Sequence, residues 1–271
     1  MTQQERRMFL IRHLLAEERR YEDVAVPAAE GEQRRLLRGL MNVRPPRAAG
    51  REFLQVQDDY LRQEREEKGV TGLDQLRPVD VDADGQLYLW QGDITGLRCG
   101  AIVNAANSGM TGCYVPCHAC IDNCIHTYAG VQLRLDCARL MAEQGREEPT
   151  GRARLTRAYN LPCDYVLHTV GPIIQDRVRA EDRRLLAGCY RSCLELAEAH
   201  GVESIAFCCI STGVFRFPNQ AAAEIAVATV RRYLAQTNSK MKVIFNVFKD
   251  KDREIYERLL GADPAAEAGA G

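Results

Sequence analysis

The sequence has no long apolar run, no excess of charge of one sign and no standard nucleotide-binding fingerprint. Its hydrophobic stretches are far shorter than the ~20 residues that a membrane-spanning helix requires. Lys and Arg number 36 and Asp and Glu 37, for a formal net charge of -1, so we expect neither nucleic acid nor an anionic membrane as a partner. The patterns GxGxxG and GxxxxGK(S/T) are absent, which removes the motif evidence for a Rossmann dinucleotide site and for a P-loop.

The N-terminal residues carry no secretion signal pattern. They read MTQQERRMFLIRHLL, which is polar, then briefly apolar, then charged, without a small-residue cleavage site. The 11 cysteines are clustered or lie in apolar strand-like segments such as 207–210. This usage is typical of free thiols and metal ligands rather than of disulfides. We therefore expect a cytoplasmic protein, and we expect a monomer.

Strand and helix patterns alternate in the larger, C-terminal part of the chain. Apolar strand patterns lie at 87–90, 101–103, 165–170, 205–210 and 243–247, and helical patterns at 121–141, 185–199, 221–234 and 252–260. This alternation predicts a layered α/β fold with a mostly parallel sheet over residues 81–262. Residues 1–80 have helical apolar faces broken at Pro45-Pro46 and predict a small helical extension that covers the main domain. Residues 263–271 are low in complexity, and we expect them to be disordered.

Six potential metal ligands fall within one short segment: Cys113, Cys117, His118, Cys120, Cys124 and His126. Thiolate sulfur and neutral imidazole nitrogen are the usual protein ligands of zinc. The paired CxxC ribbon of a closed site is missing, although residues 117–120 form one half of such a pattern. Three ligands alone would leave a fourth position open, which is the catalytic arrangement. The alternative is that these are reduced, buried cysteines, and spacing alone leaves open which thiols bind.

Polar segments directly follow three of the predicted strands, at 92–93, 104–107 and 211–215. Ligands of open α/β sheets bind beyond the carboxyl ends of the strands, so these segments predict one cleft. The backbone amides of the turn at 211–215 can hold phosphate, although such turns also serve as helix caps. Asp93 can accept a hydrogen bond from an exocyclic amine such as that of adenine, or can cap a turn.

Together these motifs resemble the macrodomain family, which binds ADP-ribose. The segments GDIT (92–95), AIVNAANS (101–108), the Asp-x-x-Ile-His-x-x-Ala-Gly run (122–130) and ISTGVF (210–215) have the order and spacing of that family. The segment GCYVPCHAC (112–120) stands where most members have a glycine-rich loop, and is similar to the zinc-dependent branch. That branch removes ADP-ribose from modified proteins and has an N-terminal helical extension. The resemblance implies a three-layer α/β/α fold with a mixed, mostly parallel sheet.

The resemblance also implies roles for individual residues. It implies one zinc ion per chain, held by Cys113, His118 and Cys120, with Cys117 and Cys124 as non-ligands. It implies catalytic roles for Asp122 and Asn107, and His126 is expected to be a packed or capping residue. The implied substrate-binding residues are Asp93, Ile94, Asn107, Asn123, Ser211, Thr212, Gly213, Val214 and Phe215.

The implied activity is glycosidase-type hydrolysis that frees mono-ADP-ribose from protein. The bond joins C1″ of the distal ribose to Asp, Glu or another O-linked side chain. The first role expected of zinc is to position and polarise a ribose hydroxyl or the departing oxygen, and the second is to activate water. Asp122 is expected to position that water or to act as base. The resemblance further suggests that a sirtuin-like transferase attaches the ADP-ribose and that the modified protein is of the lipoyl-carrier type. The alternatives are a non-enzymatic ADP-ribose reader with structural zinc, an O-acetyl-ADP-ribose deacetylase or ADP-ribose phosphatase, and an interaction protein that works through its helical N-terminus.

Overall fold

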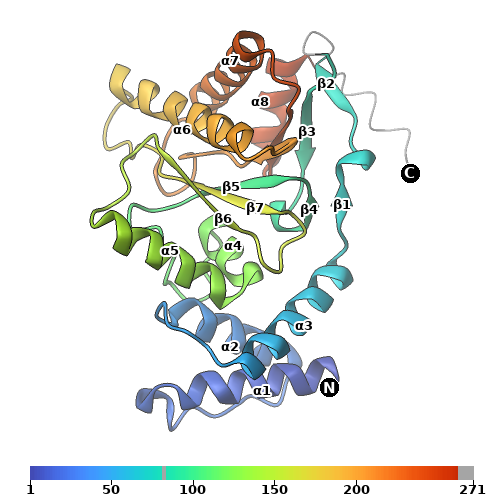
Figure 1. Ribbon diagram of the computed structural model, residues 1–271, viewed down its shortest axis with the longest axis vertical. Helices are drawn as coiled ribbons and strands as arrows, with labels where there is room; N and C mark the ends of the chain where they lie inside the picture. The colour runs from blue at the N-terminus through green and yellow to red at the C-terminus, as the bar shows by residue number, and fades with distance from the viewer. Residues whose placement is uncertain (81–83, 262–271) are drawn as a thin grey trace.

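The computed structural model describes residues 1–80 and 84–261, and it shows a helical N-terminal unit beside a layered α/β unit (Figure 1). The N-terminal unit consists of α1 (Gln3–Ala16), a short 3-10 turn (Arg19–Tyr21), α2 (Glu30–Val43) and α3 (Arg51–Lys68). Thr2 begins α1 with a capping box that it shares with Glu5. The three helices bury a second apolar cluster, which includes Leu10, Leu37 and Phe53 and is joined by Val131 from the α/β unit. Among the described residues, those before residue 70 thus form the predicted helical extension.

A mixed seven-stranded sheet lies at the centre of the α/β unit, in the order β2-β3-β9-β8-β5-β7-β6. Its strands are β2 (Pro78–Asp80), β3 (Leu87–Gln91), β5 (Ala101–Ala105), β6 (Ala153–Arg157), β7 (Tyr165–Thr169), β8 (Ser204–Phe207) and β9 (Lys242–Val247). The edge strands β2 and β6 run antiparallel to their neighbours, and the strands between them are parallel. A separate parallel pair joins β1 (Thr71–Gly72) to β4 (Leu97–Arg98). The sheet therefore confirms the predicted mixed, mostly parallel arrangement. It also includes residues 78–80, which were predicted to belong to the helical extension.

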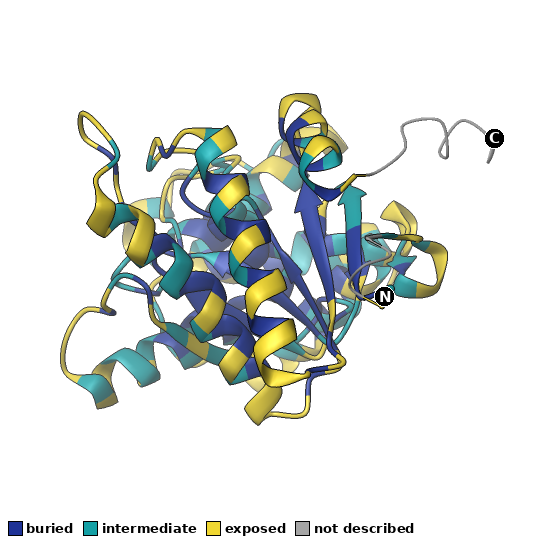
Figure 2. Ribbon diagram, turned by 90° about the horizontal axis from the view of Figure 1, so that it is seen from above, coloured by how far each residue is buried: buried dark blue, intermediate teal, exposed yellow. Residues whose placement is uncertain are grey.

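Helices cover both faces of this sheet. The helices α6 (Ala180–Ala199), α7 (Asn219–Thr237) and α8 (Asp250–Leu260) pack against one another on one side, and α4 (Ile121–Ala129) and α5 (Val131–Gln144) lie on the other (Figure 1). The strands β5, β7, β8 and β9 are almost entirely buried, while the helices expose their outer faces (Figure 2). In the described part of the chain, no helix has the length and apolarity needed to cross a membrane. The tail 263–271, expected to be disordered, lies outside the described residues.

The single helix predicted over 121–141 was wrong, because Gly130 divides it into α4 and α5. Gly130 has a φ of 101°, a conformation that glycine tolerates and that ends the first helix. The next amide, Val131 N–H, donates to Gln57 Oε1 of α3 at 2.9 Å. A Cβ at Gly130 would lie 2.6 Å from Gln57 Nε2, so the break and the docking of α3 depend on each other.

Candidate functional site

The three predicted polar segments follow three strands within a run of four adjacent parallel strands. Asp93 follows β3, Asn107 follows β5 and Ser211 follows β8, while Phe248 follows the remaining strand β9. Because these strands are parallel neighbours, their carboxyl ends meet at one edge of the sheet. The structure thus brings the sequence-predicted segments to a common edge, where a ligand of an open α/β sheet binds.

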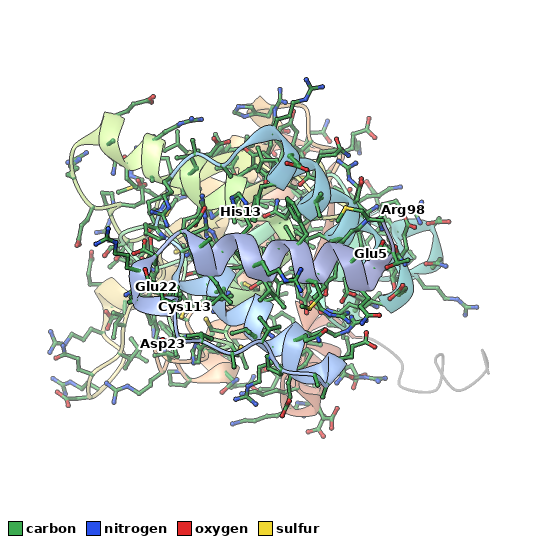
Figure 3. The ribbon with its side chains drawn as sticks, turned by 90° about the horizontal axis from the view of Figure 1, so that it is seen from below. Glu5, His13, Glu22, Asp23, Arg98 and Cys113 are labelled. Atoms are coloured by element: carbon green, nitrogen blue, oxygen red, sulfur yellow. The ribbon has the colours of Figure 1, made fainter. Side chains whose placement is uncertain are left out.

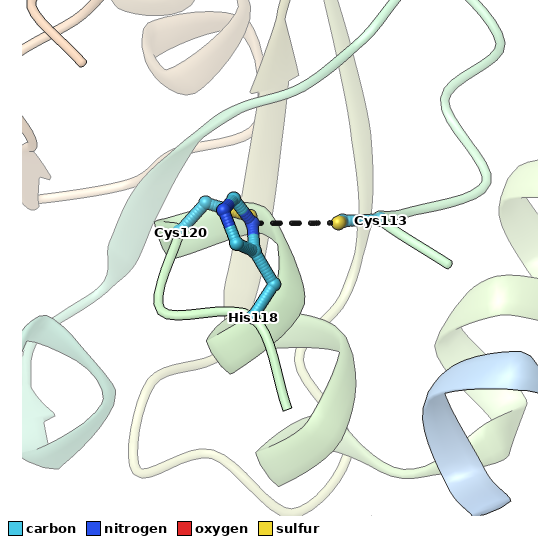
Figure 4. Close-up of side chains that lie close together, drawn as sticks. All are labelled: Cys113, His118 and Cys120. Carbon is cyan, nitrogen blue, oxygen red and sulfur yellow. Dashed lines mark hydrogen bonds between the residues drawn. The ribbon is translucent and has the colours of Figure 1, made fainter. Parts of the chain in front are cut away.

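Cys113, His118 and Cys120 bring their donor atoms together in the segment 112–120, here called the Cys/His loop. Their Sγ and ring nitrogen atoms all lie within 4.8 Å of one another. The Sγ of Cys113 is 3.6 Å from Nδ1 of His118 (Figure 4). In a tetrahedral zinc site with Zn–S about 2.3 Å and Zn–N about 2.05 Å, the sulfur–nitrogen separation is about 3.5 Å. The two thiols and the imidazole therefore fit a zinc ion in both chemistry and spacing.

The thiol of Cys120 lies in a setting that disfavours its ionisation without a cation. Burial, and then the neighbouring Cys113, raise the pKa of Cys120 to about 12, although the Asn123 amide opposes this by donating to its sulfur. A divalent cation between the thiols would reverse this preference, since metal coordination deprotonates a thiol.

The other two cysteines between residues 113 and 126, Cys117 and Cys124, make different contacts. Cys117 Sγ lies 3.3 Å from the backbone oxygen of Arg35 in α2. Cys124 Sγ faces the guanidinium of Arg38, at 3.6 Å. Neither belongs to the group of donor atoms that Cys113, His118 and Cys120 form.

Asp122 sits in the first turn of α4, two residues after Cys120, and is held by two asparagines. Its Oδ1 accepts from Asn104 Nδ2 at 2.8 Å, and its Oδ2 accepts from Asn107 Nδ2 at 3.2 Å. Asn107 Nδ2 also donates to the backbone oxygen of Gly112 at 3.1 Å. The end of β5, the start of the Cys/His loop and the carboxylate are therefore tied into one unit.

Burial raises the pKa of Asp122 to about 6, while hydrogen bonds from Asn104 and Asn107 and the charge of Arg134 act against this rise. The carboxylate is 5% exposed. At neutral pH it is mostly ionised but weakly stabilised, which is the condition of a carboxylate that can accept a proton or orient a water molecule.

Two buried histidines lie beneath this carboxylate. His126 Nε2 is 3.5 Å from Asp122 Oδ1, and neither ring nitrogen of His126 has a hydrogen-bond partner among the described residues. Burial, followed by the neighbouring His168, lowers the pKa of His126. His168 Nδ1 contacts Asn104 Nδ2 at 3.1 Å, and its Nε2 contacts Thr156 Oγ1 at 2.9 Å. These neutral imidazoles pack under the acid, as was expected for His126.

Asn123, predicted as a substrate contact, has its side-chain amide hydrogen-bonded to the Cys/His loop and to Arg38. Its side chain is fully buried, and its Nδ2 donates to the backbone oxygens of Val115 at 3.0 Å and Cys113 at 3.4 Å. Its Oδ1 accepts from Arg38 at 2.9 Å. The amide is thus fully used in shaping the Cys/His loop.

At the other end of the sheet edge, Asp93 uses one carboxylate oxygen as a cap and presents the other. Its Oδ1 accepts from Thr95 N at 3.0 Å, the capping role considered above. Its Oδ2 lies 3.6 Å from Lys68 Nζ, which also lies 3.7 Å above the ring of Tyr128. A cavity of about 310 Å³ borders Asp93, Lys68 and Tyr128. Ile94, the residue after Asp93, is buried, with 1% exposure.

The segment 211–215 forms a tight, partly exposed turn after β8. Ser211 has a φ of 64°, and its backbone oxygen accepts from Phe217 N at 2.9 Å. Arg216 N donates to Gly213 O at 3.0 Å, which closes the turn. Space is open around Gly213, and Val214 is exposed. The turn therefore leaves an accessible backbone beside which an anionic group can lie.

Three relevant residues were not assigned from the sequence: Asn104, Arg134 and Phe248. Phe248 is 74% exposed and comes directly after β9. Its backbone oxygen accepts from Gln91 next to the Gly92-Asp93 turn. An exposed aromatic residue directly after the last strand was the signal that could have identified it. Arg134, in contrast, carries no signal in its local sequence, because its partners lie in α2.

Comparison with known proteins supports this picture of the fold and the motifs. The model of the Macro domain family matches residues 103–226. A protein of Treponema medium named "Protein-ADP-ribose hydrolase" is 61% identical over 260 residues, covering 96% of this chain and 100% of the relative. The chain belongs to the macrodomain family. A protein-ADP-ribose hydrolase of Staphylococcus aureus (strain Mu50 / ATCC 700699) is 49% identical over 256 residues, covering 94% of this macrodomain protein and 95% of the relative.

A solved macrodomain also resembles this one in three dimensions. The Trypanosoma brucei macrodomain, solved in complex with ADP-ribose, superposes with a TM-score of 0.64 at 33% identity, covering 79% of this chain and 92% of that chain. The similarity confirms the expected macrodomain architecture.

Proposed function

We propose that this protein is a zinc-dependent hydrolase that removes mono-ADP-ribose from modified proteins. The bond cleaved joins C1″ of the distal ribose to an oxygen of Asp, Glu or another O-linked side chain. The observation that carries the proposal is that one helix turn holds both Cys120, a member of the donor triad, and the buried carboxylate Asp122. Relatives 61% and 49% identical, both named protein-ADP-ribose hydrolase, support it.

The nucleotide would lie along the carboxyl edge of the sheet. Asp93 Oδ2 would accept a hydrogen bond from the adenine amine, and the exposed ring of Phe248 would stack on the base. Backbone amides of the turn at 211–215 would bind the diphosphate. This orientation would bring the distal ribose to Asn107, Asp122 and the Cys/His loop.

In the reaction, the water oxygen bonds to C1″ and the side-chain oxygen leaves with the electron pair of the broken bond. Asp122, ionised at neutral pH, orients the attacking water and accepts its proton. That proton then passes to solvent when a carboxylate leaves, or to the leaving oxygen when a hydroxyl side chain leaves. Asn104 and Asn107 hold the two carboxylate oxygens so that the accepting lone pair keeps its direction. A zinc ion held by Cys113, His118 and Cys120 would supply Lewis-acid polarisation of a substrate oxygen and make water more acidic.

The linkage can be tested with a panel of mono-ADP-ribosylated proteins that carry the modification on Asp or Glu, on Ser or on Arg. ADP-ribose release is followed by mass spectrometry, and free ADP-ribose binding is measured by calorimetry on the same preparation. We expect release from one or more O-linked substrates and none from the Arg-linked protein, whose leaving atom is nitrogen. Binding without release from every substrate would overturn the hydrolase and favour a reader.

A further inference from the structure

The helix α2 of the N-terminal unit lies directly against the Cys/His loop. A Cβ on Gly39 would lie 3.8 Å from Pro116 Cβ and 3.9 Å from Cys117 Sγ, so the helix and the loop are in van der Waals contact. Figure 3 views the molecule from the side of α1 and labels Cys113. The N-terminal unit therefore contacts the predicted metal site as well as covering the fold.

Asn42, near the end of α2, holds the middle of this loop. It is 1% exposed, its Oδ1 accepts from Cys117 N at 2.9 Å, and its Nδ2 donates to Thr127 Oγ1 in α4 at 2.9 Å. Cys117 has a φ of 55°, which a residue with a Cβ adopts only where its surroundings impose it. The amide of Asn42 thus fixes the backbone turn immediately before His118.

Arg38, one turn earlier on α2, holds the backbone of a donor residue itself. Its Nη2 donates to the backbone oxygen of His118 at 2.8 Å and to Asn123 Oδ1 at 2.9 Å. Asn123 in turn donates to the backbone oxygens of Val115 and Cys113. A single guanidinium therefore fixes His118 directly and the Cys113 side of the loop through Asn123.

Arg134 of α5 ties the end of α2 to the outer side of the loop. Its Nη1 donates to Arg44 O at 2.7 Å and Asn42 O at 2.5 Å, which are carbonyls at the C-terminal end of α2. The same guanidinium lies 4.3 Å from the centre of the Tyr114 ring. These contacts fix the position of Asn42 relative to the Cys/His loop that it binds.

We propose that α2 is an integral part of the metal site, and that Arg38 and Asn42 are positioning residues that hold His118 and Cys117 in a metal-ready arrangement. This inference rests on the proposed function, because it takes the Cys/His loop to be a zinc site. Residues that orient metal ligands from outside alter metal affinity by about 10-fold to 100-fold when they are removed. The N-terminal helical unit would then tune metal retention, while making no contact with the metal itself.

The test measures zinc affinity and zinc dissociation rate by competition with a chromogenic chelator, in the full chain. The variants are Arg38→Ala, Arg38→Lys and Asn42→Ala, the last of which removes both the oxygen acceptor for Cys117 N–H and the donor to Thr127. Arg34→Ala is the matched control, since Arg34 lies on the same helix and pairs with Glu30 and Glu64 instead of the loop. Thermal unfolding of the zinc-free proteins measures any general loss of helix packing.

We expect Arg38→Ala and Asn42→Ala each to weaken zinc binding by at least about 10-fold and to speed zinc dissociation, with partial recovery in Arg38→Lys and no change in Arg34→Ala. Wild-type affinity and dissociation rate in both Arg38→Ala and Asn42→Ala would overturn the inference and leave the proposed function intact. A wild-type protein that binds no zinc would overturn the proposed function and the inference with it.

Discussion

Asn107 Nδ2 lies 3.2 Å from Asp122 Oδ2, and this contact joins the loop after β5 to the first turn of α4. Asn104 supplies the matching donor to the other carboxylate oxygen. The acid is therefore held by two side-chain amides, one from β5 and one from the loop that follows it. A buried carboxylate fixed in this way is a positioned proton acceptor.

Asp122→Asn is expected to lower the rate of ADP-ribose release by about 10²-fold to 10⁴-fold, with ADP-ribose affinity changed only a few-fold. The substitution removes the charge, and its NH₂ group would face an amide donor of Asn104 or Asn107. Single-turnover release and calorimetric binding of ADP-ribose measure the two effects separately. Asp136→Asn on α5, where Asp136 pairs with Arg139, is the matched control. A wild-type rate in Asp122→Asn would rule out a catalytic role.

Phe248→Ala is expected to weaken ADP-ribose binding about 5-fold to 150-fold, since stacking of a base on an aromatic ring contributes about 1–3 kcal/mol. The ring is 74% exposed, so its removal leaves the core intact. Phe248→Tyr keeps a stacking surface and should bind ADP-ribose nearly as well as the wild type. Calorimetric titration with ADP-ribose and with ribose 5-phosphate, which lacks the base, provides the check. Equal affinity of Phe248→Ala and wild type for ADP-ribose would place the adenine elsewhere.

The buried His168 predicts a specific pH dependence of stability. Burial lowers the pKa of His168 to about 3, whereas an unfolded histidine has a pKa of about 6.5. The folded state therefore binds fewer protons than the unfolded state between these values, and its stability falls as pH falls through this window, by up to about 1.4 kcal/mol per pH unit. Asp122, with its raised pKa, acts in the opposite direction at lower pH.

A comparison of the wild type with His168→Gln isolates this contribution, because Asp122 is common to both proteins. We expect the variant to be less stable at pH 7.5, and the difference in free energy of unfolding to shrink by about 1 kcal/mol between pH 6.5 and 5.5. Urea unfolding at both pH values gives the two differences. If the difference in free energy of unfolding between the two proteins stays constant over this range, His168 is not held neutral in the folded state.

The sequence predicted the features that depend on local patterns. Alternating apolar segments located the five parallel strands, and the GDIT and NAAN segments located the edge where the site lies. The donor triad also came from a local motif. The break at Gly130 was missed, because the apolar helical period continues across it and only the contact with Gln57 reveals it.

Contacts between the N-terminal unit and the Cys/His loop could not be predicted from the sequence, for a different reason. Arg38 and His118 are 80 positions apart, and Asn42 and Cys117 are 75 apart. Neither arginine nor asparagine on a helix has a local feature that distinguishes a solvated side chain from one that reaches into another unit. Asn123 illustrates the same limit: its place in the motif suggested substrate contact, whereas its amide is directed to the loop and to Arg38.

The most direct test of the account is ADP-ribose release from an O-linked mono-ADP-ribosylated protein, measured with zinc content before chelation, after chelation and after zinc is restored. Wild type and Cys117→Ser should contain one zinc per chain, lose activity on chelation and regain it with zinc. Cys113→Ala and His118→Ala should contain little zinc and show little release. Undiminished release from a preparation verified to be free of metal would contradict the proposal that release of ADP-ribose depends on zinc.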